Sequence, residues 1–154
     1  MSHHNEITNL LGKYCHLVDR GQPQEVAQLF AEDAVLLPKY DGPYRVEGRD
    51  AIQGWYQFYT DNFKVGIRHL KHLIHSIVID VDDSGVKASG MCYLTAYLIS
   101  NADGMAHQAQ GTYFDTYVQQ NGEWLFSQRE INVEFLTDCG APVEQLEPLG
   151  FPTS

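Results

Sequence analysis

Residues 69–135 read HLKHLIHSIVIDVDDSGVKASGMCYLTAYLISNADGMAHQAQGTYFDTYVQQNGEWLFSQREINVEF, and this stretch decides the fold. Three turn sequences divide it: DDSG at 82–85, NADG at 101–104 and QNG at 120–122. The segments between the turns have the residues and spacing of strands, which we predict over 69–81, 86–99, 105–119 and 124–135. Short Asx-Gly turns join antiparallel neighbours, so the pattern predicts an antiparallel meander. Strands of this length also predict strong coiling or a bulge.

The residues before this stretch have the period of amphipathic helices. Apolar residues recur at steps of three and four over 6–19, and Gly21 ends this first helix. Pro23 suits the first turn of a second, short helix. Gly48 precedes a third helix, which we predict over 49–63.

The order of the predicted elements indicates an α+β fold. A short strand at 34–37, a loop at 38–43 and a strand near 44–47 separate the second helix from the third. We expect three N-terminal helices packed on the concave face of a strongly curved antiparallel sheet, which forms a cone-shaped barrel with a partly empty interior. Residues 1–136 form this single domain, and 137–154 form an irregular C-terminal tail that contains three prolines.

Composition excludes several classes of protein. The 154 residues are 44% hydrophobic, which suffices for a core, and 10 basic against 20 acidic residues disfavour binding to nucleic acid. No apolar run is long enough to span a membrane, and the N-terminus lacks the apolar stretch of a signal peptide. The cysteines, Cys15, Cys92 and Cys139, are odd in number and widely spaced, which favours reduced thiols in a cytoplasmic protein. Cys15 and Cys92 lie among apolar residues, so we expect them in the core.

Several strings, in this order and spacing, resemble the SnoaL-like proteins of the nuclear-transport-factor-like, cystatin-like superfamily. The resemblance covers about residues 6–136, and it rests on YCHLVDRG at 14–21, LFAEDA at 29–34, GRDAI at 48–52, His72, GTYFD at 111–115 and GEWLFSQR at 122–129. It implies the cone fold predicted above. That fold hosts enzymes, ligand binders and structural subunits, so the resemblance alone leaves the function open.

The resemblance also implies a pair of catalytic residues. Scytalone dehydratase and hexachlorocyclohexane dehydrochlorinase use an Asp on the first helix and a His on the first long strand, and the matching positions are Asp19 and His72. Where the related pattern often has Asn three residues after the His, this chain has His75. The pair itself is intact, but the substrate of either relative does not transfer directly.

Elementary chemistry supports the same pair. Asp19 flanks the apolar stripe of the first helix, and strand alternation places Leu70, His72, Ile74 and Ser76 on one face. An unperturbed imidazole titrates near pH 6.5, so one nitrogen can accept a proton while a carboxylate fixes the other. A core histidine and a solvated aspartate are the alternative interpretation. His69 and His75 fall on the opposite face from His72, so the three histidines do not suit a metal site, and we predict neither metal nor cofactor.

Other residues are candidates for binding a substrate. Tyr14 could offer its hydroxyl to a substrate oxygen, and Trp55 and Tyr59 belong to the stripe of the third helix, where a place in the core is the alternative. Tyr93 and Tyr113 belong to tyrosine rows, with Tyr97 and Tyr117, that suit either a cavity wall or a contact between two sheets. Arg129 suits an interior carboxylate, an anionic ligand or a structural salt bridge.

Three functions fit these observations. The first is a cofactor-independent lyase or isomerase, such as a dehydratase, a dehydrohalogenase or an enzyme like ketosteroid isomerase, with His72 as general base and Asp19 orienting it. The second is a module that binds a small hydrophobic molecule without changing it. The third is a structural subunit similar to the small subunits of ring-hydroxylating oxygenases. We expect a homodimer or higher homo-oligomer.

Overall fold

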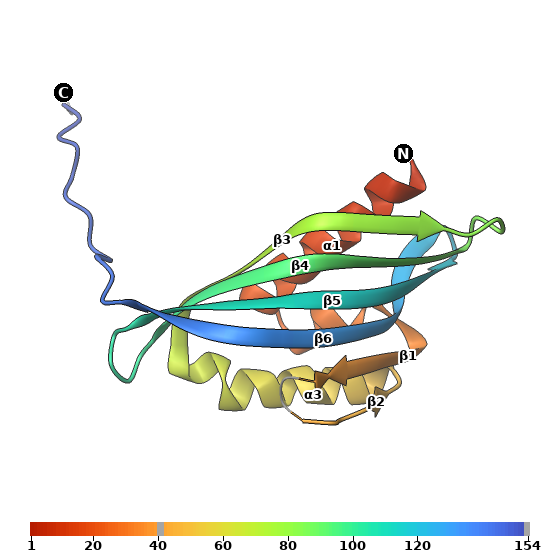
Figure 1. Cartoon of the computed structure of the whole chain (residues 1–154), viewed down its shortest axis with the longest axis horizontal. Coiled ribbons are helices and arrows are strands. Elements are labelled where there is room, and N and C mark those ends of the chain that lie inside the picture. The colour runs from red at the N-terminus through yellow and green to blue at the C-terminus, as the bar shows by residue number, and fades with distance from the viewer. Residues whose placement is uncertain (40–41, 153–154) are drawn as a thin grey trace.

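The computed structural model describes residues 1–39 and 42–152, so Tyr40 and Asp41 of the predicted loop at 38–43 lie outside the described residues (Figure 1). The helices are α1 (His3–Arg20), α2 (Pro23–Ala27) and α3 (Arg49–Asn62), and the 3-10 turn η2 (Lys64–Gly66) follows α3. The strands are β1 (Phe30–Pro38), β2 (Val46–Glu47), β3 (Ile67–Val81), β4 (Lys87–Ser100), β5 (Ala106–Gln120) and β6 (Glu123–Gly140). The predicted elements all occur, with ends that shift by a few residues.

Helix α1 begins three residues earlier than its apolar period indicates. The hydroxyl of Ser2 accepts a hydrogen bond from the backbone N–H of Asn5, which caps the first turn. Gly21 ends the helix, as predicted. The buried stripe of α1 matches the sequence pattern closely and consists of Ile7, Leu10, Leu11, Tyr14, Cys15 and Val18.

The sheet is mixed and open, which corrects the prediction of an antiparallel barrel. Its strand order is β2-β1-β6-β5-β4-β3, and the meander from β3 to β6 is antiparallel, as predicted. Strand β1 runs parallel to β6, with Leu36 opposite Arg129. No turn sequence predicts this pairing, because the two strands are about 90 residues apart in the chain. Strands β2 and β3 remain edges of the sheet, so it does not close into a cone.

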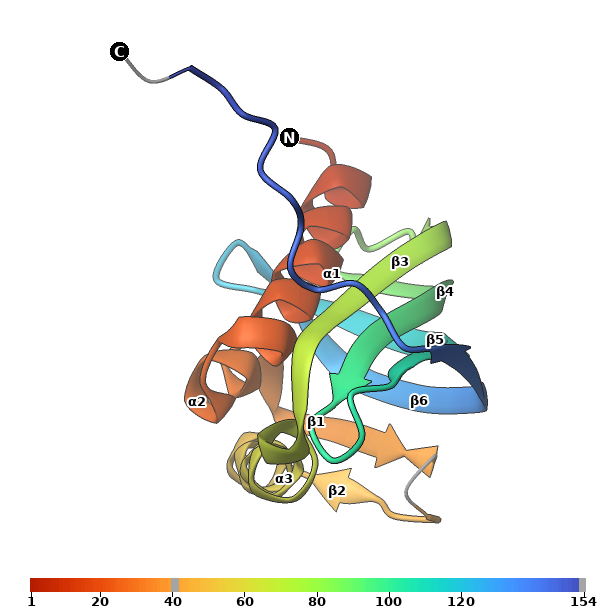
Figure 2. The ribbon, with the colours of Figure 1, turned by 90° about the vertical axis from the view of Figure 1, so that its left-hand side faces the viewer.

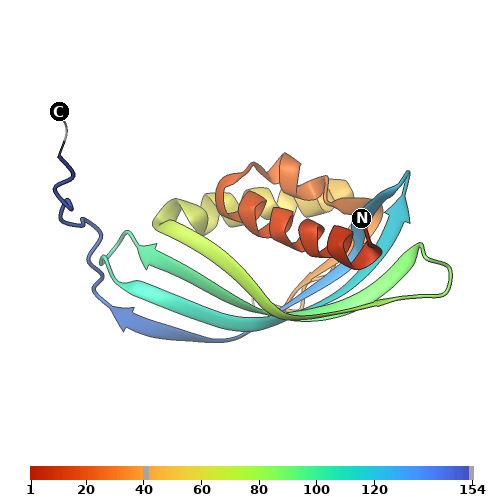
Figure 3. The same cartoon turned by 90° about the horizontal axis from the view of Figure 1, so that it is seen from above.

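The helices lie on one side of the sheet. Figure 3 shows α1 and α3 on the side toward which the strands bend, and Figure 2 shows α1 beside β3, with α3 below it next to β1 and β2. The core lies in this layer, between the helices and the inner sheet face. Side chains such as Phe30, Ile52 and Phe126 are fully buried there. Among the described residues, no helix lies on the opposite sheet face (Figure 3).

Two irregularities in β3 set which of its side chains point toward the helices. His69 and Ser76 have φ values of 56° and 53°, and the β3–β4 register shifts beside each of them. Leu70, His72 and Ile74 are partly buried on the inner side, as alternation predicts. Ser76, predicted on the same side, is exposed, because the bulge adds a residue and reverses the alternation that follows. The predicted bulge therefore exists.

Gly111 is one of two positions in the meander, with Gly90, where a Cβ atom would collide with the backbone of the neighbouring strand. A Cβ atom at this position would lie 2.2 Å from the backbone oxygen of Asn132 on β6, at a point where the β5–β6 register shifts. Since backbone cannot move as a flexible side chain can, the two strands approach each other only because residue 111 lacks a side chain.

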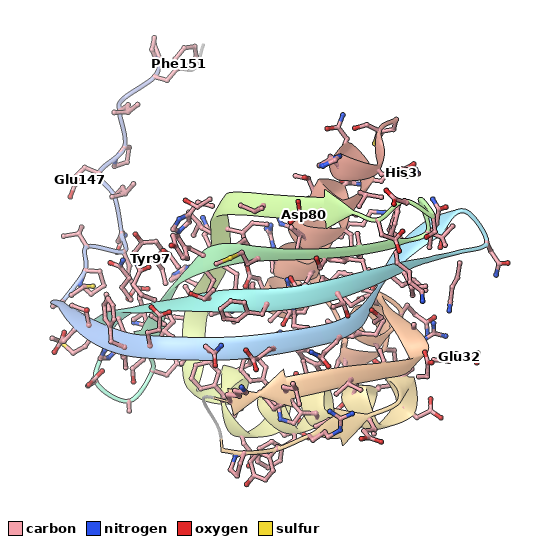
Figure 4. The ribbon with its side chains drawn as sticks, turned by 45° about the vertical axis from the view of Figure 1, so that its right-hand side comes forward. His3, Glu32, Asp80, Tyr97, Glu147 and Phe151 are labelled. Atoms are coloured by element: carbon pink, nitrogen blue, oxygen red, sulfur yellow. The ribbon has the colours of Figure 1, made fainter. Side chains whose placement is uncertain are left out.

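The last strand extends four residues beyond the predicted domain boundary at 136. The segment from 141 to 152 contains neither helix nor strand. It extends from the end of β6 and includes Glu147 and Phe151 (Figure 4). Ion pairs of Glu144 with Arg68 and His69 connect the beginning of this C-terminal segment to β3. Within the described residues, no helix combines the length and the apolar composition needed to cross a bilayer.

Candidate functional site

A cavity of about 560 Å³ lies between the helices and the inner face of the sheet. Helices α1 and α3 supply one wall, and strands β3 to β6 supply the other. Its lining is almost entirely apolar and aromatic: Tyr14, Val18, Trp55, Tyr56, Phe58, Tyr59, Asn62, Phe63, Leu70, His72, Leu94, Ala96, Leu98, His107, Ala109, Tyr113, Ile131, Val133, Phe135 and Leu136. A cavity with such walls and few polar groups suits a small, mainly apolar molecule.

Asp19 and His72 are in contact at the wall of this cavity. Asp19 lies in the last turn of α1, and His72 lies on β3 at the edge of the sheet. One carboxylate oxygen, Oδ1, is 2.6 Å from His72 Nδ1, and the other, Oδ2, accepts a hydrogen bond of 3.0 Å from the His72 backbone N–H. An edge strand has backbone N–H groups that no neighbouring strand accepts, and here Asp19 of α1 accepts the hydrogen bond of the His72 N–H. The two contacts fix both the backbone and the ring of His72.

The contact determines which nitrogen of His72 faces the cavity. An ionised carboxylate only accepts hydrogen bonds, so Nδ1 must donate, and Nε2 of the neutral ring carries the lone pair. No described residue forms a hydrogen bond with Nε2, and the His72 ring lines the cavity. The side chains of His72 and Asp19 are 10% and 8% exposed, so they are shielded from water but open to a guest molecule. The arrangement can accept a proton from such a guest.

Two tyrosine hydroxyls form a second polar group in the cavity wall, beside the Asp19–His72 pair. The hydroxyl oxygens of Tyr14 on α1 and Tyr56 on α3 are 2.6 Å apart. Burial raises the pKa of Tyr14, although the charge of Arg129 partly opposes this, and burial raises the pKa of Tyr56 well above its usual value. Both hydroxyls therefore keep their protons at neutral pH. One of the two hydrogens is used between the oxygens, so the other is available to a substrate oxygen.

Four of the six predicted binding residues line the cavity: Tyr14, Trp55, Tyr59 and Tyr113. The rings of Trp55 and Tyr59 stack, with centroids 5.5 Å apart and planes at 17°. Burial raises the pKa of Tyr59 and of Tyr113, so these hydroxyls are neutral as well. The alternative of a place in the core also holds, because Tyr14 and Tyr113 belong to the buried core, and Trp55 and Tyr59 pack against it.

Tyr93 does not line the cavity, and its alternative placement in a contact between two sheets stays a prediction. It is 48% exposed on the outer sheet face, where its ring contacts His75, and Tyr97 is similarly exposed. Its neighbours in the chain, Cys92 and Leu94, are buried. Alternation correctly separated the two faces of this strand, but tyrosine rows occur on both faces of the sheet, and the sequence does not say which face the helices cover.

Arg129 does not reach the cavity and instead forms a buried ion pair behind it. Its guanidinium donates to both carboxylate oxygens of Asp115, at 2.8 and 2.7 Å, and both side chains are 0% exposed. The guanidinium carbon lies 4.2 Å from the ring centre of Tyr14 and 3.9 Å from that of Tyr113. Arg129 therefore pairs with an interior carboxylate in a structural salt bridge, and it does not line the cavity as a residue for an anionic ligand would.

Sequence reasoning missed two polar residues of the cavity, His107 and Asn62. Strand alternation could have identified His107. Ala109, Gly111 and Tyr113 are buried on one face of β5, and residue 107 lies on that face as well. Asn62 is the last residue of α3. It is polar, so the apolar period of the helix does not identify it as a cavity residue.

The three thiols should differ sharply in reactivity. Burial raises the pKa of Cys15 to about 11 and that of Cys92 to about 12, whereas Cys139 is exposed. A raised pKa keeps the thiol protonated below that pH, and only the thiolate attacks a disulfide reagent. At mildly alkaline pH we expect one fast-reacting thiol for each native chain, and two more after denaturation. Rapid reaction of all three thiols in the folded protein would contradict the buried placement of Cys15 and Cys92.

Comparisons with known proteins agree with this architecture. The SnoaL-like domain family matches residues 1–130. A comparison with the curated proteins finds no match. A candidate scytalone dehydratase from Novosphingobium aromaticivorans is 26% identical, with a TM-score of 0.74 over 94% of this chain and 95% of that one.

Two more distant structures share the fold. The hexachlorocyclohexane dehydrochlorinase LinA Type2 is 17% identical, with a TM-score of 0.73 over 96% of this chain and 95% of that one. An NTF2-like protein with a cystatin-like fold from Novosphingobium aromaticivorans is 20% identical, with a TM-score of 0.72 over 85% of this chain and 81% of that one. At these identities the likeness establishes the architecture alone.

Proposed function

This chain belongs to the SnoaL-like domain family, and on that premise we propose that it is a cofactor-independent lyase or isomerase acting on a small, mainly apolar molecule. The observation that carries the proposal is the contact of 2.6 Å between Asp19 and His72 at the wall of an apolar cavity. The 26% identity to a candidate scytalone dehydratase supports the lyase class.

The reaction begins with removal of a proton from a carbon atom of the substrate. Nε2 of His72 accepts the proton, and the ring becomes an imidazolium. The carboxylate of Asp19 stabilises the new charge through Nδ1 without taking a proton itself, in a site where few other polar groups compete. A positioned base of this kind contributes about 10²–10⁴-fold to the rate.

A carbon acid needs a group that stabilises the negative charge left behind. The hydrogen that the Tyr14–Tyr56 pair does not use internally is suited to donate to a substrate carbonyl oxygen as it becomes an enolate. Since the walls are apolar, this hydrogen bond is stronger than it would be in water. The electron pair then either expels a group from the neighbouring carbon, which is an elimination, or takes a proton elsewhere, which is an isomerisation.

Exchange of carbon-bound protons tests the proposal without knowledge of the natural substrate. Phenylacetone, an apolar ketone with acidic protons next to its carbonyl group, is incubated with the protein in D₂O and followed by proton NMR. We expect exchange well above that caused by free imidazole at the same concentration. Retention of a bound ketone without exchange would favour the hydrophobic binding module, and neither binding nor exchange would contradict the proposed function.

A cavity-filling variant localises the activity. Ala109 lines the cavity and its neighbour Gln108 points to the other face of β5, so Ala109→Phe fills the space whereas Gln108→Phe does not. We expect Ala109→Phe to lower exchange at least about tenfold, which corresponds to about 1.4 kcal/mol of lost transition-state binding. Gln108→Phe is the matched control. Equal activity of the two variants would show that the reaction occurs outside this cavity.

A further inference from the structure

The first bulge of β3 decides toward which sheet face His72 points. Arg68 lies opposite Ile99 of β4, and His72 lies opposite Ala96, so three residues of β3 face two of β4 between these pairs. Without the extra residue, the register set at Arg68 would place His72 opposite Thr95. Ala96 lines the cavity, and its neighbour Thr95 points to the outer face. Because a shift of one residue moves a side chain to the other face, His72 reaches the cavity only through this bulge.

The backbone at this bulge has a conformation that histidine rarely adopts. His69 has a φ of 56°, in the left-handed region, where a Cβ atom is crowded by the backbone. Glycine is the usual residue at a bulge position of this kind, since it has no Cβ. A strained residue persists only where its surroundings hold it in place. The contacts beside His69 therefore bear on the orientation of His72.

Glu144 of the C-terminal segment makes these contacts. Its carboxylate accepts hydrogen bonds from Nε and Nη2 of Arg68, the first at 2.8 Å, and one of its oxygens is 3.1 Å from Nε2 of His69. One carboxylate thus contacts two consecutive residues at the start of the bulge. The third guanidinium nitrogen, Nη1, donates to Oδ1 of Asn101 at 2.8 Å, in the turn between β4 and β5. The network joins the C-terminal segment, β3 and this turn.

The network is shielded from water in part. The side chains of Arg68 and Glu144 are 36% and 32% exposed, and the guanidinium and the carboxylate meet through two parallel hydrogen bonds. Such a paired geometry is the strongest form of an arginine–carboxylate contact. The Arg68 side chain holds the pKa of the Glu144 carboxyl below its usual range, so this carboxylate stays charged at neutral pH.

We propose that Glu144 is a positioning residue, which holds the bulge at His69 in place and thereby keeps the ring of His72 on the cavity face in contact with Asp19. Glu144 itself does not line the cavity, so it acts through the strand. The effect on a reaction rests on the proposed function. The effect on the contact between His72 and Asp19 does not, and it is measured without a substrate.

The first measurement is the proton NMR signal of the His72 ring. A proton on Nδ1 that is shared with a carboxylate at 2.6 Å resonates far downfield of other ring protons, and its loss in His72→Gln assigns it. In Glu144→Gln we expect this signal to weaken and broaden, because part of the molecules has the ring turned away from Asp19. Glu147→Gln, which changes an exposed glutamate of the same segment, is the matched control and should keep the wild-type signal.

The second measurement is proton exchange from phenylacetone. For Glu144→Gln we expect kcat to fall about tenfold, which corresponds to about 1.4 kcal/mol, and KM to stay unchanged because the cavity wall is intact. Glycine adopts the left-handed conformation without strain, so His69→Gly should need no support from the C-terminal segment. Adding Glu144→Gln to His69→Gly should therefore lower neither kcat nor the ring signal further.

The outcomes separate this inference from the proposed function. A wild-type ring signal and kcat in Glu144→Gln would overturn the inference and leave the proposed function intact. The same tenfold loss in the His69→Gly background, or a rise in KM together with the fall in kcat, would show that Glu144 does not act through the bulge, and this also overturns the inference. If the wild-type protein exchanges no protons, the proposed function fails, and the ring signal alone decides whether Glu144 positions His72.

Discussion

Replacement of His72 by Gln is expected to lower the rate of proton exchange from phenylacetone by about 10²–10⁴-fold. Glutamine keeps a polar side chain of similar length, which can still donate to Asp19 Oδ1. It has no nitrogen lone pair for a proton, because the amide nitrogen is only a donor. The backbone hydrogen bond from residue 72 to Asp19 Oδ2 remains. The change therefore removes the base and retains the contact that orders the edge of the sheet.

Two further variants separate the base from its orientation. Asp19→Asn should also lose most of the activity, because an amide can no longer stabilise the imidazolium by charge and can present its N–H to Nδ1, which favours the wrong tautomer. His75→Gln, on the outer face of the same strand, should retain full activity. Exchange by His72→Gln at the wild-type rate, in a protein that unfolds at the wild-type temperature, would contradict the role of His72 as the base.

The second large effect concerns stability. Replacement of Arg129 by Met is expected to lower the free energy of unfolding by about 3–5 kcal/mol, the usual cost of removing one partner from a buried ion pair. Asp115 would remain fully buried as a carboxylate, with the hydroxyl of Tyr117 at 3.0 Å as a remaining donor. Chemical denaturation monitored by tryptophan fluorescence measures the change.

Two controls identify the cause of this loss. The double variant Arg129→Met, Asp115→Leu should recover part of the stability, because no uncompensated charge remains in the core. In the single variant the orphaned carboxylate takes up a proton more readily in the native state than in the unfolded state. The loss should therefore shrink as the pH falls. Two results would contradict this explanation. One is a loss of unfolding free energy below about 1 kcal/mol for Arg129→Met. The other is a loss in the double variant equal to the sum of the losses in the two single variants, since additive losses show that the two charges do not interact.

Much of the fold was predictable because its signals are local. The period of three and four in α1 and the Asx-Gly turns between β3, β4, β5 and β6 depend on neighbouring residues alone, and the structure confirms them. The parallel pairing of β1 with β6 was not predictable in this way, since it joins segments at opposite ends of the chain. The prediction of an antiparallel barrel failed at this point.

For the candidate site, the sequence determined which residues share a face, and the tertiary structure decided which face matters. Alternation put Tyr93 and Cys92 on opposite sides of β4, and residues 107 and 109 on one side of β5, because successive side chains of a strand must point apart. Only the packing of α1 and α3 decided which side encloses the cavity, and so excluded Tyr93 and included His107. The contact between Asp19 and His72 is likewise tertiary, because a helix end and an edge strand 53 residues apart meet only when the helix covers the sheet.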